Sequence, residues 1–202
     1  IIARFQGGPN AGHTIEFDNK KFILHTIPSG IFNPETMNVI GNGVIIDPYI
    51  FFKELENLRN NSIDPEQNLL ISKKAHLILP THRMLDAAYE NLKGKAKIGS
   101  TLKGIGPTYT DKAARLGLRV GNLAMSDFFN QYKALKDKHL QILQWHKVDV
   151  NSQKIEGLSL ADYEARWFAA VEHLQSLSII DSEYFINESL NQGKSLLAEG
   201  AQ

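Results

Sequence analysis

A glycine-rich segment near the start of the sequence carries residue types that suit phosphate chemistry. Residues 6–14 read Gln-Gly-Gly-Pro-Asn-Ala-Gly-His-Thr and directly follow an apolar run at 1–5 that is typical of a buried strand. Glycine lets the backbone approach a ligand closely and present bare N–H groups. Asn10 can donate to a phosphate oxygen, and His13 can transfer a proton near neutral pH or stabilise a phosphoryl oxygen. Small residues around one histidine therefore indicate a phosphoryl-transfer site, where positioning and charge stabilisation do most of the catalysis.

A second glycine-rich segment combines hydroxyl groups with positive charge. Residues 99–107 read Gly-Ser-Thr-Leu-Lys-Gly-Ile-Gly-Pro, within a predicted loop over 97–108. The short helix predicted after this loop carries Asp111, Lys112 and Arg115, and Arg119 follows shortly beyond it. Hydroxyls, backbone N–H groups and cations together are typical of a site for a monophosphate.

Both segments also have simpler interpretations. The first could be a tight turn with an incidental histidine, and it is not a P-loop, because the Gly-Lys-Ser/Thr ending is absent. The second could be a solvated loop followed by an ordinary amphipathic helix. Residue types alone leave these alternatives open.

The other polar and aromatic candidates give weaker signals. Gln202, in the closing Glu-Gly-Ala-Gln, has an amide that could bind the edge of a nucleobase. No pair of the remaining histidines shows a metal-ligand spacing supported by nearby carboxylates, so we expect these on the surface or in the core: His25, His76, His82, His139, His146 and His173. Several aromatics at helical spacing are predicted to be core rather than a stacking platform: Phe128, Phe129, Tyr132, Trp145, Trp167 and Phe168.

The elements that must position these segments alternate between strands and helices. Asp47 and Pro48 predict a helix start, as cap and first helical residue. This alternation predicts an α/β fold with a mostly parallel central sheet flanked by helices. The predicted strands are 1–5, 38–40, 69–72 and 195–199, with a hairpin over 14–17 and 21–25 around Asp18 and Asn19. The predicted helices begin at Asp47, at Thr81 (to about Leu92), at Thr110 or Asp111 (to Leu116), at Asp127 (to about Trp145), at Ser159 (to Leu177) and at Asp181 (to Gln192).

The stretch from about 120 to 192 is nearly all helix in this prediction. It could form a helical subdomain or a layer against the sheet. We expect residues 1–202 to be part of a single α/β domain whose helix-rich portion covers about 121–193. The chain does not begin with Met, and both ends fall inside what look like strand-and-turn motifs, so we expect truncation at both ends.

Composition limits the class of partner. The chain has 22 basic and 22 acidic residues, so no net charge favours nucleic acid or an anionic membrane. It contains no cysteine, which excludes a disulfide framework and a thiolate metal site. No signal peptide is visible, and no apolar run approaches the roughly 20 residues that a membrane helix requires.

Taken together, the motifs resemble those of the adenylosuccinate synthetase family. The resemblance rests on Gln-Gly-Gly-x-Asn-Ala-Gly-His-Thr at 6–14, Ile-Gly-Asn-Gly-Val at 40–44, Lys-Gly-Ile-Gly-Pro-x-Tyr-x-Asp-Lys at 103–112 and Leu-Ala-Glu-Gly-Ala-Gln at 197–202. Their order and separations match the family as well. The likeness extends over 1 to about 123 and again over about 195–202, and the first and third motifs are highly specific as a pair.

The resemblance implies a two-step ligation in the cytoplasm. GTP phosphorylates the 6-oxygen of IMP to give 6-phosphoryl-IMP, and the amine of L-aspartate then displaces phosphate. The products are adenylosuccinate, GDP and phosphate, in the first committed step of AMP synthesis from IMP. Mg²⁺ is the implied cofactor and GTP the co-substrate.

The resemblance also implies roles for individual residues. His13 would be the catalytic acid, and Gly12, His13 and Thr14 would border the GTP phosphates. Gly12 would offer its carbonyl to Mg²⁺. Arg115 would reach the IMP of a neighbouring subunit, which makes a homodimer part of the mechanism. The implied IMP-binding residues are Asn10, Ala11, Gly12, His13, Thr101, Arg115 and Gln202.

The sequence also departs from the family pattern. The family has an upstream glycine-rich loop whose Asp is the catalytic base and a Mg²⁺ ligand, and downstream segments that bind aspartate and guanine; none of these lies within the 202 residues. Leu102 and Lys103 stand where many members have Gly-Arg, which keeps the cation. We therefore expect the chain alone to be inactive and its full-length parent to be active.

Three alternatives follow from these departures. A non-catalytic IMP- or nucleotide-binding fragment, or a degenerate homologue without the Asp loop, would bind IMP and release no phosphate. A different phosphotransferase using the same two loops would not require aspartate. A structural protein with coincidental motifs would bind no nucleotide.

Overall fold

A computed structural model describes residues 1–17, 19–96 and 99–201 of the chain. Asp18 of the predicted hairpin turn, Lys97 and Ile98 of the predicted second loop, and Gln202 lie outside the described residues. Within the described residues, no helix is long and apolar enough to cross a membrane.

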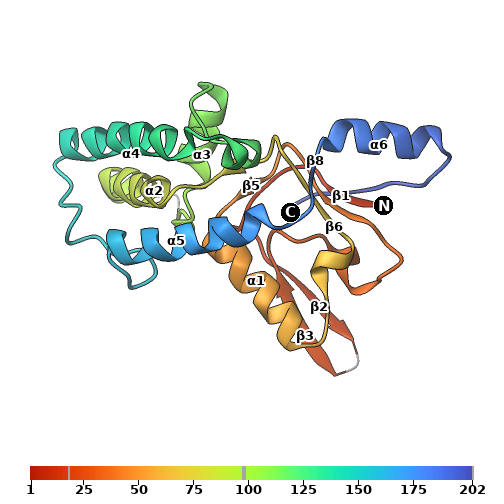
Figure 1. Cartoon of the computed structure of the whole chain (residues 1–202). Coiled ribbons are helices and arrows are strands. Elements are labelled where there is room, and N and C mark those ends of the chain that lie inside the picture. The colour runs from red at the N-terminus through yellow and green to blue at the C-terminus, as the bar shows by residue number, and fades with distance from the viewer. Residues whose placement is uncertain (18, 97–98, 202) are drawn as a thin grey trace.

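The centre of the fold is a five-stranded sheet in which every neighbouring pair is parallel (Figure 1). This confirms the predicted α/β class. The strand order is β8-β6-β4-β1-β9, formed by β1 (Ile2–Arg4), β4 (Asn38–Ile40), β6 (Leu69–Ser72), β8 (Ile179–Ile180) and β9 (Leu197–Glu199).

The register of the sheet brings three loops together. Arg4, the last residue of β1, lies beside Ile40 of β4 on one side and Glu199 of β9 on the other. The carboxyl ends of parallel strands meet at one edge of a sheet, which is where α/β folds bind ligands. The loops that leave β1, β4 and β9 therefore meet at this edge.

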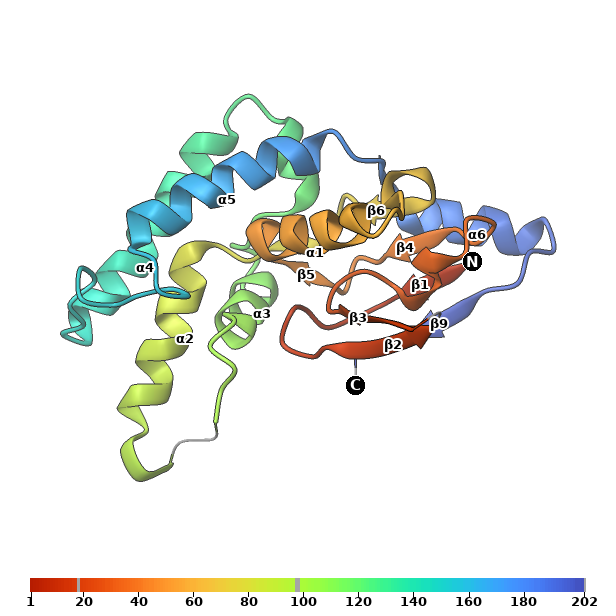
Figure 2. The same ribbon diagram turned by 90° about the horizontal axis from the view of Figure 1, so that it is seen from below.

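Helix α1 (Pro48–Asn60) begins as predicted. The side chain of Asp47 accepts from the N–H groups of Tyr49 and Ile50, and Pro48 occupies the first position. Its apolar face is buried in the core: Ile50, Phe51, Leu55 and Leu58. The helix lies beside the antiparallel hairpin of β2 (His13–Phe17) and β3 (Lys20–Leu24) (Figure 2). A hairpin was predicted here, and each of its strands differs by one residue from the predicted bounds.

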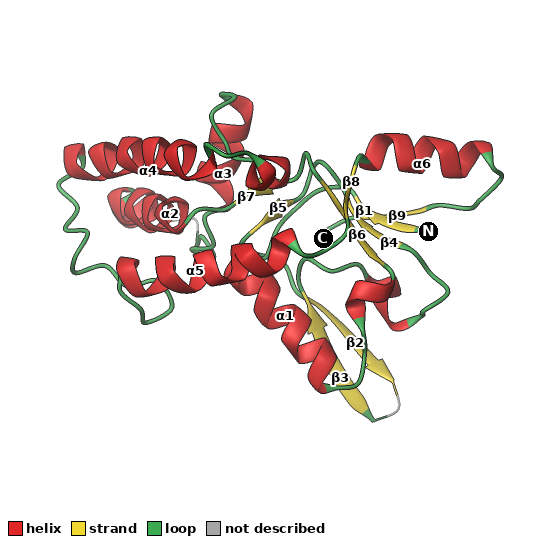
Figure 3. Ribbon diagram, viewed as in Figure 1, coloured by secondary structure: helices red, strands yellow, loops and turns green. Residues whose placement is uncertain are grey.

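The later helices form a layer at one side of the sheet, coloured red with the other helices in Figure 3. A short parallel pair, β5 (Ile45–Ile46) and β7 (His76–Leu77), connects this layer to the sheet. The helices are α2 (Pro80–Leu92), α3 (Ile105–Ala113), α4 (Phe128–Trp145) and α5 (Leu160–Gln175), while α6 (Ser182–Asn191) lies at the opposite end.

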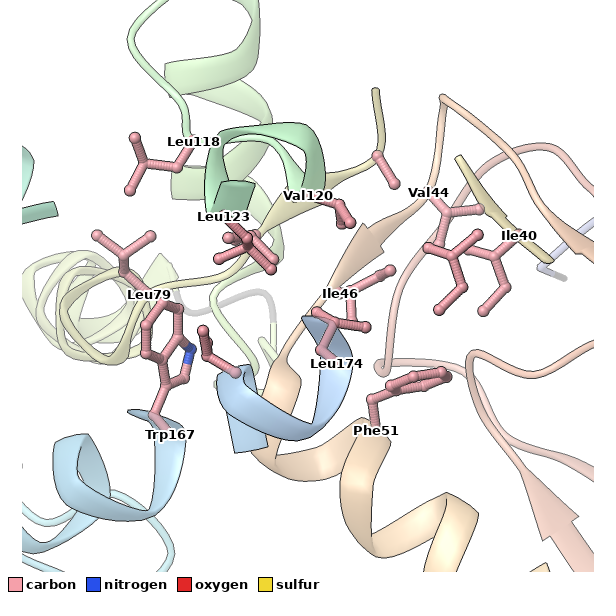
Figure 4. Close-up of a cluster of buried hydrophobic side chains, with 14 of the residues drawn as sticks. Ile40, Val44, Ile46, Phe51, Leu79, Leu118, Val120, Leu123, Trp167 and Leu174 are labelled. Atoms are coloured by element: carbon pink, nitrogen blue, oxygen red, sulfur yellow. The ribbon is translucent and has the colours of Figure 1, made fainter. Parts of the chain in front are cut away.

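One apolar core joins the helical layer to the strands. Figure 4 shows Trp167 and Leu174 of α5 in the same cluster as Ile46 of β5 and Leu79. The Trp167 indole N–H also donates to the Ile78 carbonyl at 2.8 Å. Helix α5 of the 120–192 stretch therefore shares a core with β5, and β8 interrupts the stretch before α6.

The prediction for α3 was wrong in its boundaries. The helix begins at Ile105, after Gly104 in the left-handed conformation at φ 77°, and ends at Ala113. Thr110 and Asp111 look like capping residues by type, but both lie inside the helix. Pro107 in the first helical turn was the overlooked start signal, since proline is tolerated there.

Some smaller predictions also need correction. Phe129 and Trp145 were expected in the core, yet they are 62% and 76% exposed. Helix α2 begins at Pro80 rather than Thr81. The two-residue strands β5, β7 and β8 were not predicted, because two residues carry no detectable period.

Candidate active site

A cavity of about 240 Å³ opens at the sheet edge where β1 and β9 end. It contains three of the residues proposed from sequence, Ala11, Gly12 and His13. Gly200 and Ala201, which directly precede Gln202, line it as well. The remaining lining residues are Arg4, Ser29 and Glu199.

The first glycine-rich loop is fixed through its backbone. The Ile45 N–H donates to the Gly7 carbonyl at 2.9 Å. At Gly43 the chains are so close that an added Cβ would lie 2.0 Å from the Phe5 carbonyl oxygen, so only glycine fits there. The loop's course is thus set by backbone contacts, while the side chains of Asn10 and Thr14 are exposed.

Tyr109 of α3 connects the two glycine-rich regions. Its hydroxyl accepts from the Gly7 N–H at 3.0 Å and donates to the Gly43 carbonyl at 2.9 Å. Both partners belong to the loops at the sheet edge. Helix α3 therefore braces the first loop as well as following the second.

His13 has one ring nitrogen occupied and one without a partner. Arg4 Nη1 lies 3.4 Å from Nδ1, and a guanidinium can only donate, so Nδ1 accepts and Nε2 carries the proton. Nε2 is buried and has no hydrogen-bond partner among the described residues. Burial lowers the pKa of His13, with Arg4 and His25 acting in the same direction and Glu199 opposing them. The site thus holds a neutral imidazole with one unused N–H.

Arg4 and Glu199 form the charged pair behind this histidine. Arg4 is only 1% exposed and its Nη1 lies 3.1 Å from Glu199 Oε1. Glu199 Oε2 accepts from the Ser29 N–H at 2.9 Å and the Ser29 hydroxyl at 2.5 Å. The sequence analysis missed Arg4, although a lone cation in an otherwise apolar strand was a usable signal.

A second buried carboxylate supports the segment behind the loop. Glu54 accepts from the N–H groups of His25, Thr26 and Ile27 at 2.8–3.2 Å. Burial raises the pKa of Glu54 to about 7, against the lowering effect of these hydrogen bonds. The His25 ring in turn packs against Gly12: a Cβ added to this glycine would lie 2.9 Å from Cε1 of the ring.

The second glycine-rich loop uses most of its polar groups internally. Glu90 accepts from the N–H groups of Gly99 and Ser100 at 2.6 and 3.2 Å. The Gly99 hydrogen bond lowers the pKa of Glu90 to about 2. Asp86 accepts from the Ser100 hydroxyl at 2.7 Å and the Gly104 N–H at 2.9 Å. The Lys103 ammonium donates to Glu156 at 2.8 Å.

Thr101 and Arg115 lie away from the His13 cavity. Thr101 is exposed and lines a separate cavity of about 420 Å³ together with Lys103 and Glu156. Arg115 lines another, of about 590 Å³, with Arg119 and Lys138. Within one chain the structure therefore gathers Ala11, Gly12 and His13, but not Thr101 or Arg115. Gln202 lies outside the described residues.

The described residues of the His13 cavity do not by themselves make a magnesium site. Mg²⁺ requires about six oxygen ligands in octahedral geometry, usually with one or two carboxylates. Glu199 is the carboxylate that lines the cavity, and both its oxygens are engaged by Arg4 and Ser29. The Gly12 carbonyl could supply one ligand.

Another potential ligand cluster lies inside the helical layer. His82, Asp111 and His139 are buried, and their ligand atoms lie within 4.8 Å of one another. The sequence analysis found no pair of histidines at a metal-ligand spacing supported by nearby carboxylates, because these three residues are far apart along the chain. The folded layer brings them together.

Comparison with known proteins gives one consistent family. The adenylosuccinate synthetase family model matches residues 1–202. Adenylosuccinate synthetases of Christiangramia forsetii and Flavobacterium johnsoniae are each 57% identical over 100% of this chain, and that of Porphyromonas gingivalis is 54% identical. In each case the match covers 46% of the relative, so the chain spans about half the length of the curated relatives it matches.

A solved structure agrees with this result. Fully ligated adenylosuccinate synthetase from Plasmodium falciparum superposes with a TM-score of 0.79 at 31% identity. The match covers 100% of this chain and 45% of that structure.

Proposed function

The chain belongs to the adenylosuccinate synthetase family, and we propose that within its full-length protein it forms part of a GTP-dependent ligase joining IMP and L-aspartate. The γ-phosphoryl group of GTP moves to the 6-oxygen of IMP. The aspartate amine then attacks carbon 6, and the 6-oxygen leaves with the phosphate. A purine 6-oxo group is a poor leaving group and phosphate a good one, which is the chemical reason for two steps.

The observation that supports this proposal is the state of His13. Its Nδ1 accepts from Arg4, so a proton is held at Nε2, and that nitrogen has no partner among the described residues. A neutral imidazole N–H in a small cavity can donate to the oxygen on which charge develops as a phosphoryl group moves. Arg4 and Glu199 act by orienting the ring and do not themselves react.

The other roles in this proposal follow the family motifs. Asn10, Ala11, Gly12, Thr101 and Gln202 bind IMP together with His13 and with Arg115. Gly12, His13 and Thr14 border the phosphates of GTP. Mg²⁺, when bound, would neutralise phosphate charge, and the Gly12 carbonyl would supply one of its ligands.

Arg115 acts in this proposal on the IMP of a neighbouring subunit, in a cytoplasmic homodimer. Its position in a different cavity from His13 supports an action outside its own site. Thr101 lines a third cavity, apart from those of His13 and Arg115.

Isotope transfer tests the proposal. The full-length protein is supplied with GTP, Mg²⁺, L-aspartate and IMP carrying ¹⁸O at position 6, and the phosphate released is analysed by mass spectrometry. Transfer to the 6-oxygen predicts one ¹⁸O atom in each phosphate released together with adenylosuccinate. Phosphate without ¹⁸O would contradict the route.

Omission of substrates separates the alternatives. Phosphate release without aspartate would favour a different phosphotransferase. Binding of IMP without any phosphate release would favour a non-catalytic or degenerate homologue.

A further inference from the structure

Three helices meet at a buried His–Asp–His cluster that the proposed reaction does not use directly. His82 comes from α2, Asp111 from α3 and His139 from α4, and their exposed fractions are 0%, 5% and 1%. The Nε2 atoms of His82 and His139 lie 3.0 and 2.7 Å from the same oxygen, Asp111 Oδ2. Figures 1 and 2 both show these helices side by side.

The hydrogen bonds define the tautomer of each imidazole. His82 Nδ1 accepts from the Leu79 N–H at 2.9 Å, so its proton lies on Nε2 and points at Asp111. His139 Nδ1 lies 2.7 Å from the Thr81 hydroxyl, which can donate to it while His139 Nε2–H donates to Asp111. Every nitrogen of the two rings therefore has a hydrogen-bond partner.

This pattern argues against a metal at the cluster. A metal ligand needs a free lone pair, and His82 Nε2 carries a proton as long as the backbone N–H of Leu79 occupies Nδ1. Burial lowers the pKa of the His82 imidazole to about 4, although the hydrogen bond to Asp111 opposes this effect. The cluster therefore serves to hold Asp111 from two sides.

Asp111 also closes the end of α3 through its backbone. Its carbonyl accepts from the N–H groups of Leu116 at 2.8 Å and Gly117 at 3.1 Å, while the Arg115 N–H donates to the Lys112 carbonyl at 3.2 Å. These bonds make a Schellman turn in which Arg115 occupies the left-handed position, at φ 62°. Glycine is usual at this position, because other residues rarely adopt the left-handed conformation. The surrounding structure must therefore hold Arg115 in it.

The turn presents Arg115 to a strongly basic cavity. The cavity of about 590 Å³ is lined by Arg115, Arg119 and Lys138, and Lys138 Nζ is 3.6 Å from Asp111 Oδ1. Leu116 and Gly117, the two donors to the Asp111 carbonyl, line it too. Leu116 and Gly117, which donate to the Asp111 carbonyl, directly follow Arg115 in the chain. A change at Asp111 should therefore alter the orientation of Arg115.

We propose that Asp111, clamped by His82 and His139, is a positioning residue that holds Arg115 in its left-handed turn and so sets the affinity for IMP. This inference rests on the proposed function, in which Arg115 contacts IMP. It assigns a role in substrate binding to three buried residues that touch no substrate.

A double-mutant cycle in the full-length enzyme tests this role. Asp111→Asn, Arg115→Leu and the double variant are compared for the KM of IMP, for kcat and for Tm. Asp111→Asn should raise the KM of IMP roughly 10-fold or more, the size expected for a weakened charge-assisted hydrogen bond. In the Arg115→Leu background the same change should have almost no further effect on KM. If the two residues acted independently, the rise in KM of the double variant would equal the product of the two single rises to within about twofold. That result would overturn the proposal.

Matched variants separate positioning from general stability. Glu164 of α5 accepts from the Tyr132 hydroxyl at 2.6 Å and from Lys136, so Glu164→Gln also removes a carboxylate that joins two helices of this layer. It should lower Tm without changing the KM of IMP; an equal rise in KM would overturn the proposal. If Asp111→Asn does not fold, His139→Gln, which keeps an N–H donor, should show a smaller effect in the same direction.

Two further measurements complete the test. Nitrogen-15 NMR should find His82 and His139 neutral with the proton on Nε2, whether or not the protein makes adenylosuccinate; protonation at Nδ1 would overturn the clamp. Stoichiometric zinc in the purified protein that is lost in Asp111→Asn would make the cluster a metal site and would also overturn it. Absence of adenylosuccinate from the unaltered protein would instead refute the proposed function and leave the NMR result standing.

Discussion

The two glycine-rich regions look alike in sequence and differ in how their polar groups are used. In the first, the backbone is fixed by neighbouring strands and His13 Nε2 has no partner among the described residues. In the second, Glu90, Asp86 and Glu156 take up the N–H groups, the Ser100 hydroxyl and the Lys103 ammonium. The first region therefore has a polar group available to a ligand, whereas the polar groups of the second region mainly stabilise the loop itself.

This difference shows why a loop rich in glycine and hydroxyls is a weak functional signal by itself. A group already satisfied within the protein must break a bond before it can bind a ligand, and that costs part of the binding energy. A buried polar group without a partner indicates a binding role. The free-energy cost of its desolvation is offset only when a ligand binds to it.

Replacing the histidine of the first region should cause the largest loss. His13→Asn in the full-length enzyme should lower kcat about 10³-fold, within the range for removal of a general acid, with little change in the KM of IMP. Steady-state kinetics measures both constants. The exposed His146, replaced in the same way, serves as the control. Near-normal turnover by His13→Asn would remove the chemical role from the first region.

Two buried titrating groups, Glu54 of α1 and His82 of α2, should respond to pH in opposite directions. Burial raises the pKa of Glu54 to about 7, so its contribution to stability is present at low pH and lost as pH rises from about 4.5 to 7. Burial lowers the pKa of His82 to about 4, so its contribution is present above about 6.5 and lost as pH falls towards 4. Each effect should reach about 3 kcal/mol.

Urea unfolding of the full-length protein between pH 4.5 and 7.5 measures this contrast. The free energy of unfolding of the unaltered protein is compared with that of Glu54→Gln and of His82→Gln. The difference from Glu54→Gln should shrink as pH rises, and the difference from His82→Gln should grow. If both differences in unfolding free energy changed in the same direction with pH, one of the two groups would have the opposite charge state from the one expected.

Tyr109 links the two regions, so its hydroxyl should matter to both. Tyr109→Phe leaves the Gly7 N–H and the Gly43 carbonyl without their partner, which should cost about 2 kcal/mol of unfolding free energy. The first loop would then also be less well held, and kcat should fall a few-fold. Tyr184→Phe, at a tyrosine that is 76% exposed, provides the comparison. Equal effects of the two changes would mean that the regions are not coupled through α3.

Glu90 offers the mildest and most selective perturbation of the second region. Glu90→Gln weakens the hold on the N–H groups of Gly99 and Ser100 and leaves the first region untouched. It should raise the KM of IMP roughly 10-fold with kcat nearly unchanged. A fall in kcat with constant KM would assign chemistry, rather than binding, to this loop.

The sequence was informative at several places where a local rule decides the structure. Asp47 and Pro48 marked the start of α1, and the strands at 38–40 and 69–72 have their predicted bounds. The alternation of elements was enough for the α/β class. The loop around His13 could be identified because glycine and histidine have few uses in combination directly after a buried strand.

Other features depend on contacts between distant residues and could not be read from local patterns. The pairing of Arg4 with Glu199 spans almost the entire chain, and the clamp on Asp111 joins three helices. The start of α3 was misplaced because Asp111 resembles a capping residue by type, while its surroundings make it a buried acceptor. Whether a polar group already has a hydrogen-bond partner within the protein likewise depends on the folded structure.

The most direct test of the account is adenylosuccinate formation by the purified full-length protein. IMP, L-aspartate, GTP and Mg²⁺ are supplied together and then omitted one at a time, and the product is followed by its ultraviolet absorbance. Adenylosuccinate should form only when all four are present. Adenylosuccinate formed without GTP, phosphate released from GTP without aspartate, or no product under any condition would contradict the proposed ligation.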